Sequence, residues 1–273
     1  MAGTLYIVPT PIGNLEDITL RALRVLRKVS LIAAEDTRTT GRLLAHYGIE
    51  TPQTSYHEHN KLTKLDRILD ALAVGDVALV SDAGTPGLSD PGYELIGAVL
   101  EAGMKVVPLP GPSAVISALV ASGLPTDSFT YLGFLPRKSQ ARREALAAVR
   151  DVPHTLVLYE APHRLLDTLA DVQAVLGARQ VVVTRELTKL HEEIWRGDVQ
   201  GAIRYYTENP PRGEITLVIG GAATVEPREW TEDEVRAALA ERLAAGESRS
   251  AAAKAVAQAA GWPKSRVYGL DVG

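Results

Sequence analysis

Short apolar runs alternate along the chain with longer stretches in which apolar residues recur every three or four positions. The short runs predict strands at residues 4–8, 31–34, 77–81, 106–107, 129–133, 155–159, 181–185 and 215–220. The periodic stretches predict helices at residues 16–28, 61–74, 93–101, 113–122, 140–149 and 164–176. Most of the runs are nearly continuous in Val, Ile and Leu, as is typical of strands that are covered on both faces. The alternation therefore predicts an α/β fold with mainly parallel sheets.

The pattern also divides the chain into three parts. Residues 123–127 separate two α/β blocks, and residues 222–230 have the composition of a linker. After the linker, Thr231 precedes three acidic residues, which is typical of the start of a helix. We expect α/β domains at residues 1–123 and 124–224 with a cleft between them, and a small helical module that resembles a helix-turn-helix at residues 230–273.

Composition and charge exclude several classes of protein. The 273 residues include 29 Lys and Arg against 33 Asp and Glu, so bulk positive charge cannot hold a nucleic acid, although a local basic face can. The absence of Cys excludes disulfides, thiol catalysis and cysteine-bound metals. We expect a cytoplasmic protein without a membrane partner, since no apolar run approaches the roughly 18 residues of a membrane span and the first residues do not form an export signal.

Gly and Pro are concentrated in three segments that directly follow predicted strands: VPTPIGN at residues 8–14, SDAGTPGLSDPG at 81–92 and PLPGPS at 108–113. Ligands bind beyond the carboxyl ends of parallel strands, where Pro stiffens a loop and Gly lets the backbone approach a ligand. Tight turns without a ligand are the alternative. The sequence has neither the dinucleotide motif nor the P-loop motif, which disfavours a polyphosphate ligand. S-adenosylmethionine carries no phosphate and is compatible with loops that contain Asp82 and Asp90.

Together with LYEAPHR at residues 158–164 and RGEITLVIG at 212–220, these loops resemble the tetrapyrrole-methylase-type (class III) S-adenosylmethionine methyltransferases. AEDTR at residues 34–38, SYHEHN at 55–60 and RELTK at 185–189 resemble, within that family, the enzymes that methylate a cytidine 2′-oxygen in the decoding region of 16S ribosomal RNA. The corrin-synthesising branch usually has a GGDP-type loop where this chain has SDAG, which favours the RNA branch. The likeness covers about residues 5–221 and implies two α/β domains, a homodimer and S-adenosylmethionine bound in the cleft.

The resemblance also implies which residues contact the cofactor. From the predicted first domain these are Pro9, Thr10, Gly13, Asp82, Ala83, Gly84, Thr85, Ser113 and Ala114. From the predicted second domain they are Tyr159, Glu160, Ala161, Glu214, Ile215 and Thr216.

Methyl transfer from a sulfonium requires no metal, but the ribose hydroxyl must be oriented and must lose its proton. The candidate catalytic residues lie in the motifs of the RNA branch and are Asp36, Glu58, His59, Glu186 and Lys189. Lys189 would stabilise the developing alkoxide, or act as a base if burial lowers its pKa, and Glu186 would orient it.

Two of these motifs have simpler explanations. Asp36 and Arg38 are close enough to form a surface ion pair. His57 and His59 form a pair, but no further ligand of the kind that zinc needs lies nearby in the sequence, so we expect no metal.

Basic residues occur in groups despite the acidic total, and such groups are usually solvated helix faces. The loop PRKS at residues 136–139 is different because it follows a predicted strand and would flank the cleft. We expect Arg38, Arg137 and Lys138 to contact RNA, with 16S ribosomal RNA within the small ribosomal subunit as the partner. A methylase of a tetrapyrrole such as a corrin precursor, and a non-catalytic RNA-binding module, remain as alternatives.

Overall fold

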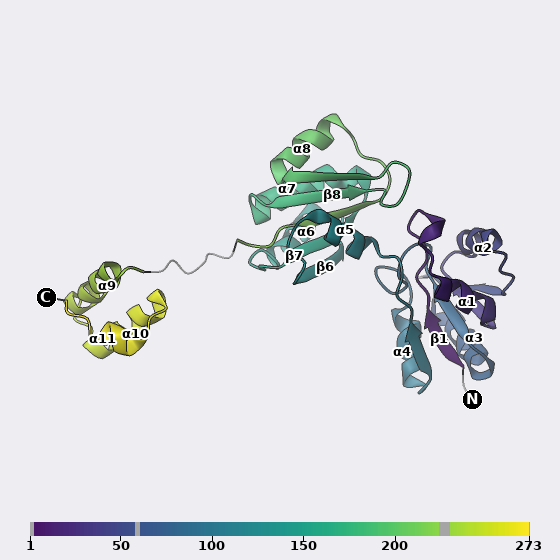
Figure 1. Cartoon of the computed structure of the whole chain (residues 1–273), viewed down its shortest axis with the longest axis horizontal. Helices are drawn as coiled ribbons and strands as arrows, with labels where there is room; N and C mark the ends of the chain where they lie inside the picture. The colour runs from purple at the N-terminus through teal and green to yellow at the C-terminus, as the bar shows by residue number, and fades with distance from the viewer. Residues whose placement is uncertain (1–2, 58–60, 224–229, 273) are drawn as a thin grey trace. The chain divides into compact units, whose positions relative to one another are not determined.

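The computed structural model describes residues 3–57, 61–223 and 230–272, and for residues 61–63 it describes only the backbone. The chain forms two compact units, Met1–Ala222 and Ala223–Gly273. The larger unit contains two five-stranded sheets with their helices, and the smaller unit contains three helices (Figure 1). The predicted α/β class is confirmed. The predicted division at residue 123 stays a prediction, because both sheets belong to one compact unit.

The first sheet is entirely parallel and has the strand order β3-β2-β4-β1-β5. Its strands are β1 (Thr4–Ile7), β2 (Leu31–Ala34), β3 (Gln53–Ser55), β4 (Val77–Val80) and β5 (Lys105–Pro108). The helices of this half are η1 (Leu15–Asp17), α1 (Leu20–Lys28), α2 (Thr37–His46), α3 (Lys61–Val74) and α4 (Tyr93–Glu101). The parallel arrangement brings the segments that follow β1, β2, β4 and β5 to one edge of the sheet.

Helices cover both faces of the first sheet, which explains why its strands are continuous apolar runs. On one face, Leu26 of α1 and Leu43 of α2 pack against Ile32 and Val80. On the other face, α3 and α4 pack against a second set of buried residues that includes Leu5 and Leu79.

The second sheet is mixed, whereas the sequence pattern predicts mainly parallel strands. Its order is β6-β7-β10-β8-β9, in which only β6 and β7 are parallel neighbours. The strands are β6 (Phe129–Phe134), β7 (Thr155–Glu160), β8 (Gln180–Arg185), β9 (Glu193–Asp198) and β10 (Ile215–Ile219). Residues 186–192 are too few for a crossover connection, so β9 must run antiparallel to β8.

The helices of the second half are α5 (Ala114–Ser122), α6 (Ser139–Ala147), η2 (Pro162–Arg164), α7 (Leu165–Leu176) and α8 (Val199–Glu208). Helix α5 packs on one face of the second sheet, against Val157 and Val218, and α6, α7 and α8 cover the other face. The strands are buried on both faces for this reason, and burial rather than parallel pairing produces their continuous apolar sequences.

Four elements are not predicted by the apolar pattern: α2, β3, α8 and β9. Strands β3 and β9 lie at sheet edges, where a polar residue can face solvent without cost. Helix α2 begins with the polar sequence TRTTGR, and its start is marked by Asp36, whose carboxylate accepts the backbone N–H of Arg38.

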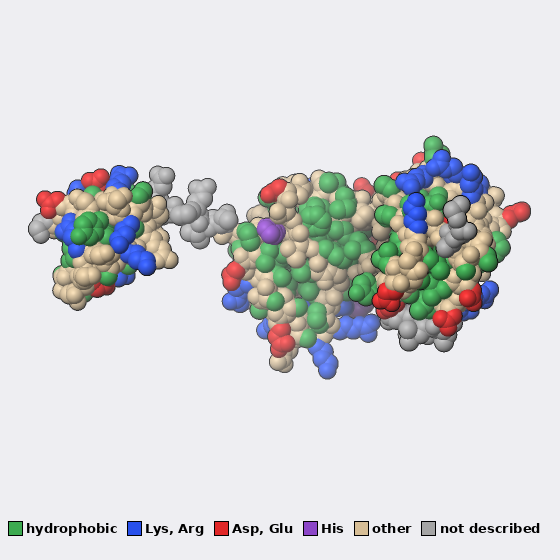
Figure 2. Space-filling model, turned by 90° about the horizontal axis from the view of Figure 1, so that it is seen from below, with side chains coloured by type: hydrophobic (Ala, Val, Ile, Leu, Met, Phe, Trp, Pro, Cys, Tyr) green, Lys and Arg blue, Asp and Glu red, His purple; other side chains and the backbone are tan. Residues whose placement is uncertain are grey.

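The smaller unit contains α9 (Glu232–Ala244), α10 (Arg249–Ala260) and α11 (Lys264–Tyr268) around a core of Val235, Leu239, Val256 and Val267. Thr231 and Glu234 form a capping box at the start of α9, as the sequence predicts for this cap. On the face that Figure 2 shows, acidic, basic and apolar side chains of this unit are interspersed. Within the described parts of the chain, no helix combines the length and the apolar character that crossing a membrane requires.

Candidate cofactor and substrate site

The three Gly- and Pro-rich loops lie together at the carboxyl edge of the first sheet and are joined by hydrogen bonds. Thr10 and Gly84 exchange two backbone hydrogen bonds of 2.9 Å. The Thr10 hydroxyl donates to the Ser81 carbonyl at 3.0 Å, and the Thr85 hydroxyl donates to the Pro112 carbonyl at 3.1 Å. Predicted cofactor contacts from all three loops are therefore held in one rigid assembly.

Two hollows border this assembly. One, of about 250 Å³, lies between the first loop, the second loop and the first turns of α2, and its lining includes Thr10, Gly13 and Asp82. The other, of about 360 Å³, lies between the first and third loops, and its lining includes Ser113 and Thr188. Both are of a size and polarity that suits part of a small-molecule ligand.

Three carboxyl groups gather at the same edge, after β2 and β4. The Asp82 backbone N–H donates to Glu35 at 3.1 Å, and the Asp36 backbone N–H donates to Asp82 at 3.1 Å. Burial raises the pKa of both Glu35 and Asp82. Burial and, next in size, the charge of Glu35 raise the pKa of Asp90 to about 7. A cation that entered this site would stabilise the ionised carboxylates and be held by them.

Lys189, in the connection between β8 and β9, reaches the first loop from the second half of the unit. Its Nζ donates to Glu186 at 2.8 Å and to Glu214 at 3.0 Å. A Cβ on Gly13 would lie 2.3 Å from Cγ of Lys189, so the aliphatic part of the lysine lies directly on the Gly13 backbone. Gly at position 13 is therefore required by a close approach, and predicted cofactor and catalytic residues meet at this point.

The charges around Lys189 keep it protonated. Burial alone would lower the pKa of Lys189, but the hydrogen bonds to Glu186 and Glu214 outweigh this effect and raise the pKa above its usual value. The same hydrogen bond lowers the pKa of Glu186. Of the two roles that the sequence leaves open for Lys189, this environment favours the charged one over the base.

The turn that carries these residues is conformationally strained. Glu186 and Thr188 have φ of +52° and +68°, in the left-handed region that residues other than glycine rarely adopt. Glu186 is held there by a hydrogen bond of 2.9 Å from the Glu214 backbone N–H, and Gly213 leaves room for its carboxylate, since a Cβ there would lie 2.2 Å from it. Strain of this kind occurs where the surrounding structure fixes a functional side chain.

The remaining predicted cofactor contacts of the second half lie on β7 and β10. Ile215 and Thr216 are buried in β10, and Ala161 follows β7. Tyr159 packs its ring against Tyr131 and Phe134, with centroids 5.5 and 5.4 Å away. Tyr131 in turn shares a hydrogen bond of 2.6 Å with Ser89 of the second loop. The second loop therefore contacts both halves of the larger unit.

Glu160 differs from its neighbours because its carboxylate points into the protein. It accepts hydrogen bonds from the Thr168 hydroxyl at 2.5 Å and the Ala161 backbone N–H at 2.8 Å, and it lies 3.3 Å from Arg164. A contact between Glu160 and a cofactor stays a prediction, but its carboxylate already contacts three protein groups.

The predicted substrate residues are more exposed. Arg38 is 85% exposed and forms an ion pair of 2.6 Å with Asp36, which lowers the pKa of Asp36 to about 2. This is the surface pair that the sequence offers as the simpler explanation. Arg137 and Lys138 are exposed before the start of α6. Glu58 and His59 lie outside the described residues.

The apolar and motif patterns leave two residues of this site unassigned, Glu35 and Tyr131. Glu35 lies inside the AEDTR motif, next to the candidate Asp36, so the motif could have indicated Glu35 as a site residue. Nothing local marks Tyr131, whose place depends on the packing of Ser89 against β6. In the described part of the chain, no group of three His, Asp or Glu side chains is arranged to hold a metal ion.

The model of the family described as Tetrapyrrole (Corrin/Porphyrin) Methylases matches residues 4–202. The chain belongs to the tetrapyrrole methylase family. Membership in this family supports methyltransferase activity for this protein.

Two relatives within the family are both named Ribosomal RNA small subunit methyltransferase I. The relative from Synechocystis sp. is 50% identical over 272 residues, covering 99% of this chain and 98% of its own length. The relative from Escherichia coli O157:H7 is 55% identical over 223 residues, covering 80% of this chain and 78% of its own length.

Solved structures of tetrapyrrole methylase fold resemble the chain at lower identity. A cobalt precorrin-4 methyltransferase is 18% identical with a TM-score of 0.61, covering 80% of this chain and 94% of its own. A diphthine synthase is 13% identical with a TM-score of 0.63, covering 80% of this chain and 90% of its own. Likeness at this level shows the fold alone, and these two proteins are named for different substrates.

Proposed function

We propose that this protein transfers the methyl group of S-adenosylmethionine to the ribose 2′-oxygen of a cytidine in the decoding region of 16S ribosomal RNA. Relatives that are about half identical over nearly the whole chain are named as ribosomal RNA methyltransferases, which supports a ribosomal RNA substrate. The observation that carries the proposal is the contact between Lys189 and Gly13, which brings a motif of the RNA branch onto a predicted cofactor loop.

The residues present at the carboxyl edge fit the cofactor. The backbone hydrogen bonds between Thr10 and Gly84 fix the first two loops, and Asp82 and Asp90 offer carboxylates to a ligand with a sulfonium and an ammonium group. When bound, S-adenosylmethionine supplies an electrophilic methyl group on a positively charged sulfur. The carboxylates would orient the ligand by charge, without the phosphate-binding loop that this chain lacks.

Lys189 supplies positive charge on the substrate side. Its ammonium stays protonated, and Glu186 and Glu214 fix its position. A fixed ammonium stabilises the negative charge that develops on the ribose oxygen as the hydroxyl loses its proton. Asp36 is a weak proton acceptor because Arg38 lowers its pKa to about 2. Glu58 and His59 remain the predicted proton acceptors.

Arg38, Arg137 and Lys138 would hold the phosphates on either side of the splayed nucleotide. A homodimer and the small ribosomal subunit as partner follow from the family resemblance and belong to the same proposal, as does a cytoplasmic location.

The first experiment is a calorimetric titration of the full chain with S-adenosylmethionine. We expect micromolar binding that Asp82→Ala weakens at least about tenfold, since the variant removes charge beside the ligand. Asp66→Ala, an exposed carboxylate on α3, is the matched control and should bind like the wild type.

The same titration separates the proposal from its alternatives. A wild-type protein that binds 16S ribosomal RNA but not S-adenosylmethionine, alone or with RNA, would be a non-catalytic RNA-binding module. Binding of S-adenosylmethionine followed by methylation of a tetrapyrrole and not of RNA would support the tetrapyrrole alternative.

A further inference from the structure

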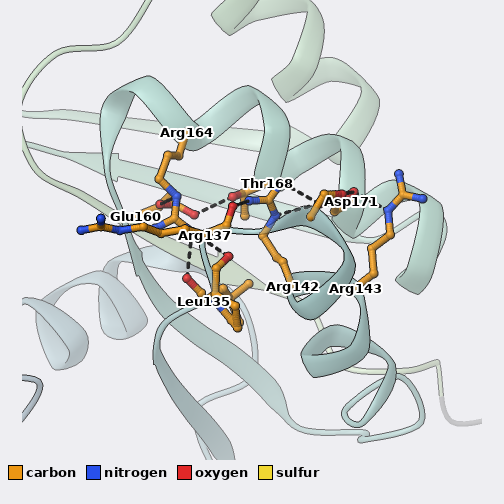
Figure 3. A network of polar contacts seen from close by, with 10 residues as sticks. Leu135, Arg137, Arg142, Arg143, Glu160, Arg164, Thr168 and Asp171 are labelled. Carbon is orange, nitrogen blue, oxygen red and sulfur yellow. Dashed lines mark hydrogen bonds and ion pairs between the residues drawn. The ribbon is translucent and has the colours of Figure 1, made fainter.

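A network of charged side chains lies around residues 135–138, the segment that joins β6 to α6 (Figure 3). Arg142 of α6 and Asp171 of α7 are its centre, with side chains only 4% and 3% exposed and 2.7 Å apart. Asp171 also accepts hydrogen bonds from Ser139 at 3.0 Å and from Arg143 at 2.5 Å. These hydrogen bonds lower the pKa of Asp171 although its burial opposes the shift.

A second ion pair borders the same segment. The Glu160 side chain is fully buried and lies 3.3 Å from Nε of Arg164, which is itself 14% exposed. Glu160 and Asp171 are therefore two buried carboxylates, each facing a buried or nearly buried guanidinium group.

Both guanidinium groups also donate hydrogen bonds to the backbone of the segment. Nη2 of Arg164 donates to the carbonyls of Leu135 at 2.8 Å and Pro136 at 3.1 Å. Nη1 of Arg142 donates to the carbonyl of Arg137 at 3.3 Å. Three successive carbonyl groups are therefore held by two arginines, and each arginine is held by a buried carboxylate.

Stability alone gives little reason for such an arrangement. Two buried ion pairs carry a large desolvation cost and are often no more stabilising than apolar residues of the same size. What the arrangement does provide is one fixed backbone conformation for a loop without regular structure.

The side chains that this segment presents are suited to RNA. Arg137 and Lys138 are exposed, and among the described residues neither side chain forms a hydrogen bond or an ion pair. Phe134, directly before the segment, is 57% exposed. Basic side chains beside an exposed aromatic ring are typical of surfaces that bind single-stranded RNA.

We infer that Arg164 and Arg142, held by Glu160 and Asp171, are positioning residues that present Arg137 and Lys138 to the phosphates of the RNA substrate. This inference rests on the proposed function. A loop that is already ordered loses less conformational entropy when it binds, so the fixed carbonyls should lower the KM for RNA and leave the chemical step unchanged.

The test is a set of steady-state measurements of methyl transfer to 16S ribosomal RNA with the full chain. The variants are Arg164→Ala, Arg137→Ala and the double variant, and Arg143→Ala is the matched control. Arg143 also contacts Asp171 but touches no carbonyl of the segment. Thermal unfolding checks each variant, and Arg164→Gln, which keeps one donor for the carbonyls, replaces Arg164→Ala if that variant does not fold.

We expect Arg164→Ala and Arg137→Ala each to raise the KM for RNA by roughly fivefold to tenfold, with kcat and the KM for S-adenosylmethionine within about twofold of the wild type. The double variant should be little worse than either single variant, because both remove the same contact. Arg164→Ala and Arg137→Ala should each also reduce the slope of log affinity for RNA against log salt concentration by about the amount that one phosphate contact contributes. Arg143→Ala should leave this slope unchanged.

Fully additive effects of Arg164→Ala and Arg137→Ala, or an equal effect of Arg143→Ala, would overturn the inference. A change in the KM for S-adenosylmethionine as large as that for RNA would also overturn it, since Arg164 would then act through Glu160 on the cofactor side. A wild-type enzyme that methylates no RNA would instead contradict the proposed function itself.

Discussion

The loops of the first sheet consist largely of Gly and Pro and are joined by backbone hydrogen bonds, whereas those of the second sheet are fixed by charged side chains. Thr10 and Gly84 illustrate the first kind, with two mutual backbone hydrogen bonds. Lys189 with Glu186, and Arg164 with Glu160, illustrate the second. We relate this difference to the ligands: backbone loops suit a small cofactor that must be enclosed, and fixed charges suit a polyanionic substrate.

We expect that removing a charged side chain from the second half lowers the free energy of unfolding most where that side chain is buried. Arg142→Ala removes the buried guanidinium that pairs with the buried Asp171 carboxylate, which should lower the free energy of unfolding by about 3–5 kcal/mol. Arg143→Ala, whose guanidinium is exposed, should cost less than about 1 kcal/mol. Urea unfolding measures both, and equal losses would show that the buried pair is not the anchor.

Lys189→Ala tests the proposed role of the Lys189 ammonium beside the substrate. We expect kcat to fall about 100-fold, because a fixed ammonium no longer stabilises the ribose oxygen, while calorimetry shows nearly unchanged affinity for S-adenosylmethionine. Leu190→Ala, at the exposed neighbouring position, is the control. A loss of only a few-fold for Lys189→Ala would remove Lys189 from the catalytic assignment.

Gly13→Ala tests whether the two kinds of loop depend on each other. The new Cβ would lie 2.3 Å from Cγ of Lys189, so the lysine must move. We expect kcat to fall about tenfold as the ammonium is displaced. Gly97→Ala is the control, since a Cβ there has no described atom within 4 Å. Normal activity of Gly13→Ala would mean that the position of Lys189 does not matter.

Asp90, at the carboxyl edge of the first sheet, should make the stability of the protein depend on pH. Its pKa is about 7 in the folded protein, above the value of 3.8 in an unfolded chain, so the unfolded state releases this proton first and stability falls as pH rises from about 4 to 7. A shift of this size corresponds to about 4 kcal/mol, which partial exposure to solvent reduces to about 1–2 kcal/mol.

Asp90→Asn should remove this loss. Relative to the wild type, the variant should therefore gain stability between about pH 4 and 7 and keep a constant difference above that range. Unfolding curves at several pH values, with Asp66→Asn as the exposed control, provide the measurement. A difference that does not vary with pH would show that folding does not raise the pKa of Asp90.

The sequence predicts the carboxyl edge of the first sheet better than it predicts the second sheet, and the reason is physical. Gly and Pro mark loops locally, and alternating strands imply that such loops share one edge of a parallel sheet, so Thr10, Asp82 and Gly84 are predicted together and found together. Edge elements such as β3 and β9 lack an apolar run, and the antiparallel pairing of β8, β9 and β10 leaves no trace in composition.

The charged network depends on pairs that are far apart in the chain. Arg142 and Asp171 are 29 residues apart, and no local pattern distinguishes a buried arginine on α6 from the exposed Arg143 beside it. The motif RELTK identifies Lys189 only through family resemblance. That Glu214 raises its pKa, and that Gly13 lies against its side chain, follows from the fold.

The most direct test of the account is to incubate the protein with small ribosomal subunits lacking this methylation and with S-adenosylmethionine labelled on its methyl group. We expect label on 16S ribosomal RNA at one cytidine of the decoding region, in a ribose that resists alkaline cleavage, and nearly none with Lys189→Ala. Absence of label from RNA, or label on a base instead of a ribose oxygen, would contradict it.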